Sequence, residues 1–247
     1  MADLYCAVRQ YLSPIVKRYA RLQTNGLDNL PKTGALLACN HSGGMWWDAV
    51  NLVTAIPNRK ITFVAHYWDG DVAPIRAFLD RLGSRYLDKS MDTIDKNNSI
   101  VQDLKAGALM CIYPEESYHT IRDRYTLFNF KPQVFKYAKL AGVPIIPTCV
   151  IGAEEASPTL YGIKRANIPW HIPLHPPIIL PFKISIRFGK PHSYKHWTGK
   201  GSNPKFLTDT DYTIGATNLR RDLFQMMSEH RNCHMQDEDY IDKVSLL

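Results

Sequence analysis

Several features that would fix the class of a protein at once are missing from this chain of 247 residues. It has an odd number of cysteines, five, and no CxxC pair. That usage argues against a disulfide framework. Because Cys39, Cys111 and Cys149 lie in apolar, strand-like runs, we expect buried, reduced thiols, as in a cytosolic protein.

Long apolar runs without charge or proline are also missing. The longest uncharged stretch, residues 166–182, is interrupted by prolines and cannot form a continuous helix. Near the N-terminus, Arg9, Lys17 and Arg18 break up any signal peptide or membrane span. We therefore predict no transmembrane helix. Since no repeat, low-complexity segment or linker divides the chain, we expect a single domain over residues 1–247.

Positive charge is in surplus, with a formal net charge of +7 and a pI near 9.1. This balance favours anionic partners, which include an acidic membrane surface, a CoA-like or phosphorylated substrate, and nucleic acid. The basic residues are dispersed and no recognition motif occurs, so we expect no nucleic-acid partner.

Residues 1–22 have the spacing of an amphipathic helix with a basic end. Its apolar residues recur at steps of three and four; they are Leu4, Ala7, Val8, Tyr11, Leu12, Ile15, Val16 and Tyr19. Two interpretations are open at this point: the helix touches a membrane, or it packs on its own domain.

From residue 34 onward, apolar strand-like runs alternate with helical periodicity. The predicted strands are 34–39, 61–66, 85–87, 108–113, 143–151 and 182–189, the last of them at a sheet edge. The predicted helices are 46–55, 73–82, 93–105, 131–142 and 214–230. On the last helix we expect a buried side made of Ile214, Leu219, Leu223, Met226 and Met227. The alternation predicts an α/β fold with a mainly parallel sheet covered by helices on both faces.

The stretch NHSGGMWWDAV, residues 40–50, follows the first buried strand, at the kind of sheet edge where ligands collect. There His41 is placed to take a proton from a hydroxyl if Asp48 holds its other ring nitrogen. The alternative is a turn in which His41 fills space and Asp48 is a first-turn helix acid. Ser42 lacks the GxSxG context of a serine hydrolase nucleophile.

Other polar residues suggest sites more weakly. His171 with His175, and His192 with His196, have a four-residue spacing but neither a helix nor further ligands, so we expect no metal site. Arg122 and Arg124 bind phosphate or form a solvated loop, and both interpretations stay open. A proline-rich loop around Trp170 either dips into a membrane interface or packs on the sheet.

Four stretches, in order, resemble the motifs of the glycerophospholipid acyltransferases, a family that includes the lysophosphatidic acid acyltransferases. They are NHSGGMWWD (40–48), GSRYLDKS (83–90), IYPEES (112–117) and GVPIIPTCV (142–150). The segment 25–41 also resembles the family's approach to its first motif. The resemblance runs over residues 26–152 and again through 182–193.

The resemblance implies an enzyme that moves a fatty acyl group from acyl-CoA or acyl carrier protein to the hydroxyl of a lysophospholipid or another lipid-like alcohol. It implies that His41 is the general base and that Asp48 orients its ring. Acceptor binding would fall to Lys89 and Glu115, with their loops shaped by Gly83 and Pro114. It further implies phospholipid biosynthesis by a cytoplasmic, peripherally membrane-associated protein that needs no metal or cofactor beyond the acyl donor.

Three departures from the family pattern bear on which acceptor the protein binds. Six residues, 42–47, separate His41 from Asp48, where the family has four, so Asp48 must fold back across Gly43 and Gly44. Glu116 stands where the family has glycine, and an unpaired carboxylate there would repel a phosphate. Lys89 replaces arginine, which exchanges a bidentate fork for a point charge.

These departures leave the identity of the acceptor open. They also leave two alternative functions: a catalytically silent lipid-binding module of the same fold, and a thioesterase or lysolipid hydrolase in which water replaces the alcohol.

Overall fold

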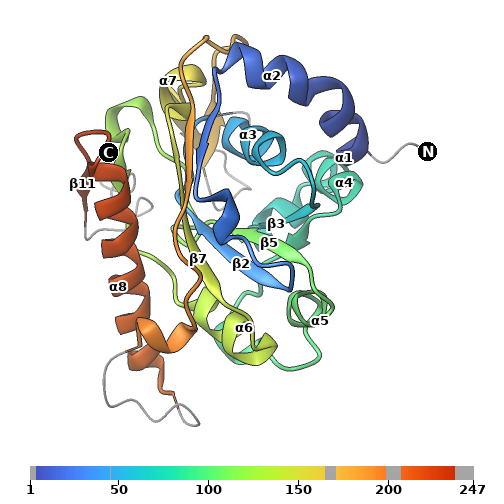
Figure 1. The fold of residues 1–247 in the computed structure, drawn as a ribbon, viewed down its shortest axis with the longest axis vertical. Helices are drawn as coiled ribbons and strands as arrows, with labels where there is room; N and C mark the ends of the chain where they lie inside the picture. Colours follow the sequence, from blue (N-terminus) through green and yellow to red (C-terminus); the bar gives the residue numbers. More distant parts are fainter. Residues whose placement is uncertain (1–3, 45, 165–170, 199–206, 237–247) are drawn as a thin grey trace.

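A seven-stranded sheet runs through the middle of the protein (Figure 1). The computed structural model describes residues 4–44, 46–164, 171–198 and 207–236. The strand order is β1-β10-β7-β2-β5-β3-β4. Five neighbouring strands are parallel: β4 (Arg85–Tyr86), β3 (Ile61–Ala65), β5 (Leu109–Ile112), β2 (Ala35–Cys39) and β7 (Ile145–Ile151). Beyond β7, β10 (Ser185–Phe188) is antiparallel, and β1 (Gln23–Asn25) pairs parallel to β10.

The parallel strands are apolar on both sides, because helices cover both faces of the sheet. In β2, Leu36 and Ala38 point into one hydrophobic core, while Leu37 and Cys39 point into the other. The first core is closed by α5 (Ser99–Lys105), α6 (Gln133–Ala141) and α8 (Asp209–Ser228), and the second by α2 (Ser13–Tyr19) and α3 (Trp47–Ala55). Figure 1 shows α8 and α3 on opposite sides of the sheet. The predicted fold class is confirmed.

Shorter elements connect these layers. The helices among them are α1 (Leu4–Ala7), α4 (Ala73–Leu82) and α7 (Ala153–Ala156). Single turns of other helix types are η1 (Val8–Leu12), η2 (Leu27–Asn29), η3 (Tyr67–Asp71), η4 (Met91–Thr93), η5 (Ile121–Asp123) and η6 (Tyr194–His196). Two small sheets pair β6 (Thr126–Leu127) with β11 (His234–Met235), and β8 (Tyr161–Lys164) with β9 (His171–Leu174).

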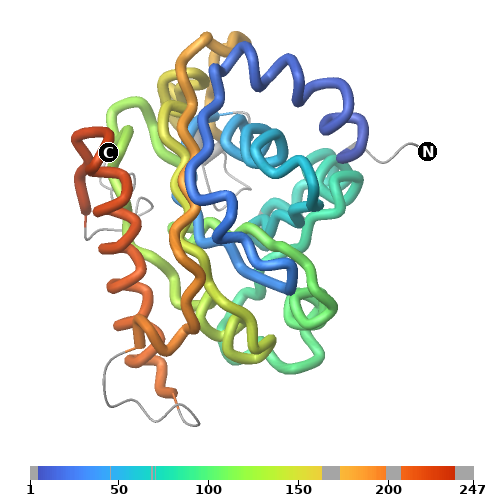
Figure 2. Tube along the Cα trace, viewed as in Figure 1, coloured from blue at the N-terminus to red at the C-terminus, as the bar shows by residue number. Residues whose placement is uncertain are grey.

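The strand predicted at a sheet edge is an inner strand, and this prediction was wrong. In Figure 2 the chain of β1 runs alongside that of β10, and Thr24 lies opposite Ile186 in the register. The pairing begins before β1, where Ile184 N–H donates to Ala20 O at 2.9 Å. The edge is therefore β1, a polar and exposed strand that shows no apolar pattern in the sequence.

Two helices begin at other residues than predicted, because their caps decide the boundary. The helix predicted from residue 93 starts at Ser99, where the Asn98 side chain accepts the Ile100 N–H. The terminal helix starts at Asp209, five residues early, behind a capping box of Thr208 and Asp211. Its buried side contains Leu219, Leu223 and Met227 as predicted, but Ile214 is exposed, and Tyr212, Gly215 and Ala216 are buried instead.

The N-terminal helix packs on the domain and still keeps an apolar side in contact with solvent. Tyr5, Val16 and Ala20 are buried, and the Tyr5 hydroxyl accepts the Ile61 N–H at 2.9 Å. Four other apolar residues of this helix are exposed: Tyr11, Leu12, Ile15 and Tyr19. Among the described residues, no helix has the length and apolar character needed to cross a membrane.

Candidate active site

The turn after β2 is tied to β7 by the side chain of Asn40. Its amide nitrogen donates to Val150 O at 3.0 Å, and its oxygen accepts the Val150 N–H at 2.8 Å, so the side chain continues the strand pairing by one position. The Ser42 hydroxyl donates to the same Val150 O at 3.1 Å. Because Ser42 is buried in this structural contact, a nucleophilic role for it has no support.

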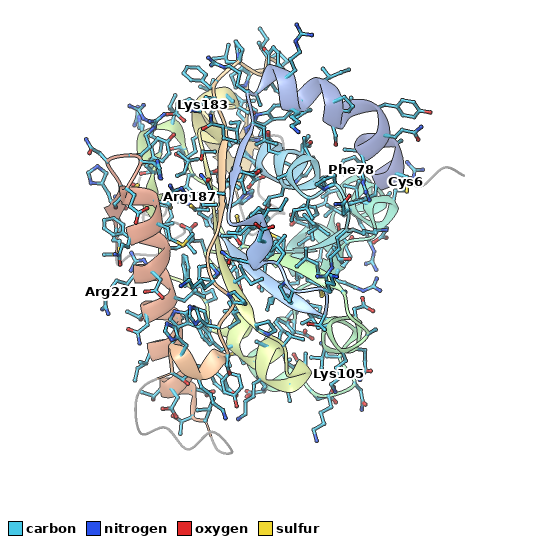
Figure 3. The ribbon with its side chains drawn as sticks, viewed as in Figure 1. Cys6, Phe78, Lys105, Lys183, Arg187 and Arg221 are labelled. Atoms are coloured by element: carbon cyan, nitrogen blue, oxygen red, sulfur yellow. The ribbon has the colours of Figure 1, made fainter. Side chains whose placement is uncertain are left out.

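Beyond Ser42 the chain reverses through residues with left-handed backbone angles. Gly43 has a φ of 80°, and a Cβ there would lie 2.6 Å from Ala153 O. A Cβ on Gly44 would lie only 2.0 Å from Nδ1 of His175. Both positions therefore need glycine for space. Trp46, at φ 53°, precedes α3, and its ring is exposed and stacks on Phe78 of α4 at 5.2 Å between centroids (Figure 3 labels Phe78).

This reversal brings His41 and Asp48 together. His41 Nδ1 lies 2.7 Å from Asp48 Oδ2; 23% of the His41 side chain is exposed, against 0% for Asp48. Asp48 also accepts the N–H groups of Ser42 at 3.2 Å and Ala49 at 2.7 Å. Asp48 is thus both a first-turn helix acid and the partner of the imidazole. The two roles that the sequence suggests for Asp48, partner of His41 and first-turn helix acid, therefore do not exclude each other.

The surroundings of His41 stabilise its protonated imidazole more than water would stabilise it. Burial by itself lowers the pKa of His41, but the charge of Asp48 and its hydrogen bond outweigh burial and raise the pKa above its ordinary value. With Nδ1–H donated to a carboxylate, Nε2 is the nitrogen left to accept a proton. A partly exposed His41 ring of this kind can act as a general base.

Glu115 supports His41 from the other side. It follows β5, and its side chain is fully buried. Oε1 accepts the main-chain N–H of His41 at 3.3 Å, and Oε2 accepts the N–H of Phe128 at 2.8 Å. Oε2 also lies 2.8 Å from Nε2 of His119. The Glu115 carboxylate therefore contacts the main chain of His41 and Phe128 and the ring of His119 in the protein interior. Its role in acceptor binding stays a prediction.

Glu116, the second carboxylate, has a partner. Its Oε2 lies 3.2 Å from Nε2 of His66, at the end of β3. The His66 N–H in turn donates to Asp69, and burial raises the pKa of that Asp69 carboxyl. One oxygen of the Glu116 carboxylate is thus engaged by His66, while Oε1 is buried without a hydrogen-bond partner among the described residues. Nothing local in the sequence points to His66, because the contact joins residues that are far apart in the chain.

The remaining predicted site residues lie in different loops. Gly83 lies against Lys60, before the start of β3, whereas His66 follows the end of that strand. Gly83 ends α4 in a left-handed conformation, and Pro114 is a buried residue of the turn that carries Glu115. Lys89 is exposed, with Nζ 5.7 Å from the centroid of the Tyr67 ring. The Tyr67 ring lies 4.3 Å from that of His66, so Lys89 flanks the side of the site that holds Glu116. Their binding roles stay predictions.

The four histidines considered as metal ligands lie in two separate places. His175 lies against Gly44, its Nδ1 3.2 Å from the Thr159 hydroxyl, and burial together with the nearby His41 lowers its pKa. The side chain of His171 and the residue Trp170 lie outside the described part. The rings of His192 and His196 stack at 4.0 Å beside Trp197, and Arg122 and Arg124 are exposed in their loop. No cluster of three metal-ligating side chains occurs within the described residues.

A mainly parallel α/β sheet with a His–Asp pair in the turn after a central strand is an arrangement that can support general-base chemistry. The family model named Acyltransferase matches residues 21–151, and the chain belongs to the acyltransferase family. The resemblance inferred from four weak motifs is thereby confirmed, and with it the enzyme class.

Curated relatives and a solved structure are also similar to this chain. An uncharacterised protein of Mycobacterium leprae is 26% identical over 91% of this chain, and one of Mycobacterium tuberculosis is 25% identical over 91%. The chain spans about two thirds of their length, 65% and 67%. The crystal structure of the 1-acyl-sn-glycerophosphate acyltransferase PlsC from Thermotoga maritima superposes with a TM-score of 0.54, at 15% identity, over 94% of this chain and 85% of that one. At that identity the likeness concerns the fold.

Proposed function

We propose that this protein transfers a fatty acyl group from an acyl thioester to the hydroxyl of a lysophospholipid or a related lipid-like alcohol, as a step of phospholipid biosynthesis. The observation that carries the proposal is the 2.7 Å contact between His41 and Asp48, in a turn where the His41 ring is partly exposed. Membership of the acyltransferase family supplies the reaction class.

The proposed step moves one proton and one acyl group. Nε2 of His41 accepts the hydroxyl proton while the alcohol oxygen attacks the thioester carbonyl carbon. The carbon–sulfur bond then breaks, and the imidazolium returns the proton to the leaving thiolate, so the products are an ester and a free thiol. Asp48 stabilises the imidazolium and fixes its tautomer through the Nδ1 contact. The chemistry needs no metal or cofactor beyond the acyl donor.

The charge of the chain fits the proposed substrates. Acyl-CoA and acyl carrier protein are both anionic, as are phospholipid headgroups, and the protein carries a formal net charge of +7. Lys89 is the residue that we propose for the polar head of the acceptor, from its position in the second motif.

Association with a membrane surface belongs to the same proposal. Besides Tyr11, Ile15 and Tyr19, exposed apolar residues occur in the segment 177–182, namely Ile178, Leu180 and Phe182. Two hydrogen bonds join this segment to the helix: Tyr19 Oη to Ile179 O at 2.6 Å, and Arg21 to Pro181 O at 2.7 Å. We call these six apolar residues the docking face.

Basic residues surround the docking face, as an anionic bilayer would require. Arg18, Arg21 and Lys183 are exposed there, and Figure 3 shows Lys183 at the end of the molecule where Figure 1 places α2 and α7. Because α7 follows β7 directly, this is the end to which the parallel strands point. The docking face would therefore lie on the same side as the catalytic turn, where a lipid alcohol arrives.

Product identification tests the proposal. Purified protein would be incubated with acyl-CoA or acyl carrier protein and a mixture of lysolipids and other lipid alcohols, and the products would be identified by mass spectrometry. We expect a new ester and an equal amount of free thiol, both absent with His41→Ala. Free fatty acid without ester would instead identify a hydrolase, and lipid binding without turnover would identify a silent binding module; either result overturns the proposal.

A further inference from the structure

His119 is a buried histidine outside the predicted motifs. It contacts Glu115, the residue that accepts the main-chain N–H of His41. Only 2% of its side chain is exposed. Nε2 lies 2.8 Å from Glu115 Oε2, and Nδ1 lies 3.4 Å from the main-chain oxygen of Asp123. Both ring nitrogens thus face oxygen acceptors. A neutral imidazole has one N–H and satisfies one of them, whereas the imidazolium has two and satisfies both.

The surrounding charges agree with the cationic form. Burial alone would lower the pKa of His119, but the charge and hydrogen bond of Glu115, with a contribution from Glu154, raise the pKa to about 9. Glu154 lies in α7 and accepts the Tyr125 N–H at 2.6 Å. The ring of His119 packs on Phe128 at 4.8 Å between centroids. A buried cation between carboxylates is stabilised only while those partners stay in place.

We propose that His119 is a positioning residue for acyl transfer: its ring holds the Glu115 carboxylate in place through the contact of Nε2 with Oε2, and Glu115 in turn fixes the main chain of His41. The inference rests on the proposed function, in which His41 is the base. His41 is then held at two points, its ring by Asp48 and its main chain by Glu115. Without His119, Glu115 keeps only the Phe128 and His41 N–H groups as donors.

His119 also balances the charge around the base. Asp48 and Glu115 both favour the protonated form of His41, and His119 opposes it. The other groups that face this cluster are the Tyr113 ring, 4.5 Å from the His41 ring, together with His175 and Asp69, which interact with His41 electrostatically. If the His119 cation is removed, the negative charge of Glu115 acts on His41 without the opposing positive charge. The pKa of His41 then rises, and the base is protonated over a wider pH range.

The test uses His119→Gln, which keeps an N–H donor for Glu115 and removes the charge, and His119→Ala, which removes both. Glu115→Gln/His119→Gln removes both charges together. His230→Gln, an exposed histidine of the described chain, is the matched control. The pKa of His41 and the protonation state of His119 would be read by NMR of isotope-labelled histidine in the folded protein without substrate, next to pH profiles of kcat and KM.

In wild type we expect His119 to be doubly protonated at neutral pH. In His119→Gln, the pKa of His41 and the acidic limb of the kcat profile should rise by about half a pH unit to one unit, because one like charge has gone. They should return toward wild type in the double variant, and KM should change little. We expect kcat to fall about tenfold in His119→Gln and about a hundredfold in His119→Ala, as for loss of an orienting group.

A neutral His119 in wild type, or a pKa of His41 that does not move in His119→Gln, would overturn the inference. So would a loss of kcat with an unchanged pH profile, because that is the mark of a purely structural residue. The NMR titration needs no turnover. It therefore tests the inference even if no acyl transfer is found, and transfer in the absence of the coupling would reject the inference alone.

Discussion

Replacing Asp48 with asparagine gives the sharpest test of the His41–Asp48 pair, because the side chain keeps its shape. Asp48 accepts three N–H groups: Oδ2 faces His41 Nδ1 and the Ser42 N–H, and Oδ1 faces the Ala49 N–H. Asparagine has one acceptor oxygen and one NH2 group, so it cannot serve both positions.

Either orientation of the introduced amide breaks the arrangement. With its oxygen toward His41, the NH2 group opposes the Ala49 N–H, which leaves a buried donor unsatisfied at a cost of about 1–3 kcal/mol. With its NH2 group toward His41, Nδ1 must accept, the ring proton moves to Nε2, and the base is lost. Reversal of the tautomer lowers kcat by about 10³- to 10⁴-fold in His–Asp pairs, or about 4–5 kcal/mol.

The pH profile gives a second signature. Because Asp48 raises the pKa of His41, Asp48→Asn should lower that pKa, and the residual activity should persist to lower pH than in wild type. This shift is opposite in sign to the one expected for His119→Gln.

Initial rates would be followed by thiol release together with mass spectrometry of the ester. Asp209→Asn, an exposed first-turn acid of α8, is the control and should keep the wild-type rate. If Asp48→Asn retained activity within about tenfold of wild type, with an unmoved pH profile, the pair would not be the catalytic centre.

Three further predictions concern the surroundings of the pair. Lys89→Ala should raise the acceptor KM about tenfold at nearly constant kcat, and an unchanged KM removes Lys89 from the site. Since the folded-state pKa of His119 is raised to about 9, its stabilisation is complete below its ordinary value of 6.5 and is lost as pH rises through 9. The midpoint temperature of thermal unfolding should therefore fall by about 10 °C between pH 6.5 and 9. The fall should be smaller in His119→Gln, and an unfolding temperature that does not change with pH contradicts the ion pair. Ile15→Asp with Ile178→Asp should abolish co-sedimentation with anionic vesicles and leave the fold intact by circular dichroism; binding at the wild-type level refutes the docking face.

Much of the central sheet could be predicted because its strands are buried on both faces. Runs such as residues 34–39 and 143–151 are apolar throughout, and glycine or proline marks the neighbouring helix ends. β1 could not be predicted in this way, since Gln23–Asn25 is a strand only through its pairing with β10. The N-terminal helix was predicted from its period, but the choice of buried side, with Val16 inside and Ile15 outside, depends on the surface it meets.

The same distinction, between local patterns and contacts of distant segments, applies to the site. His41 and Asp48 were found because they lie in one local motif, and the glycines between them indicated a reversal of the chain. The contacts of Glu115 with His119, of Glu116 with His66, and of His175 with Gly44 form only when distant strands and loops meet. His175 was considered only as a metal ligand, because four-residue spacing is a signal that sequence offers and proximity to Gly44 is not.

The anchoring of Asn40 on Val150 separates the placement of the histidine from the length of the turn that follows. The position of His41 is set upstream of Gly43, and α3 is seated independently by the burial of Trp47 and Leu52. A change in the length of the turn between these two fixed points would therefore leave the reacting nitrogen where it is, and would alter only the stretch of chain that connects His41 to α3.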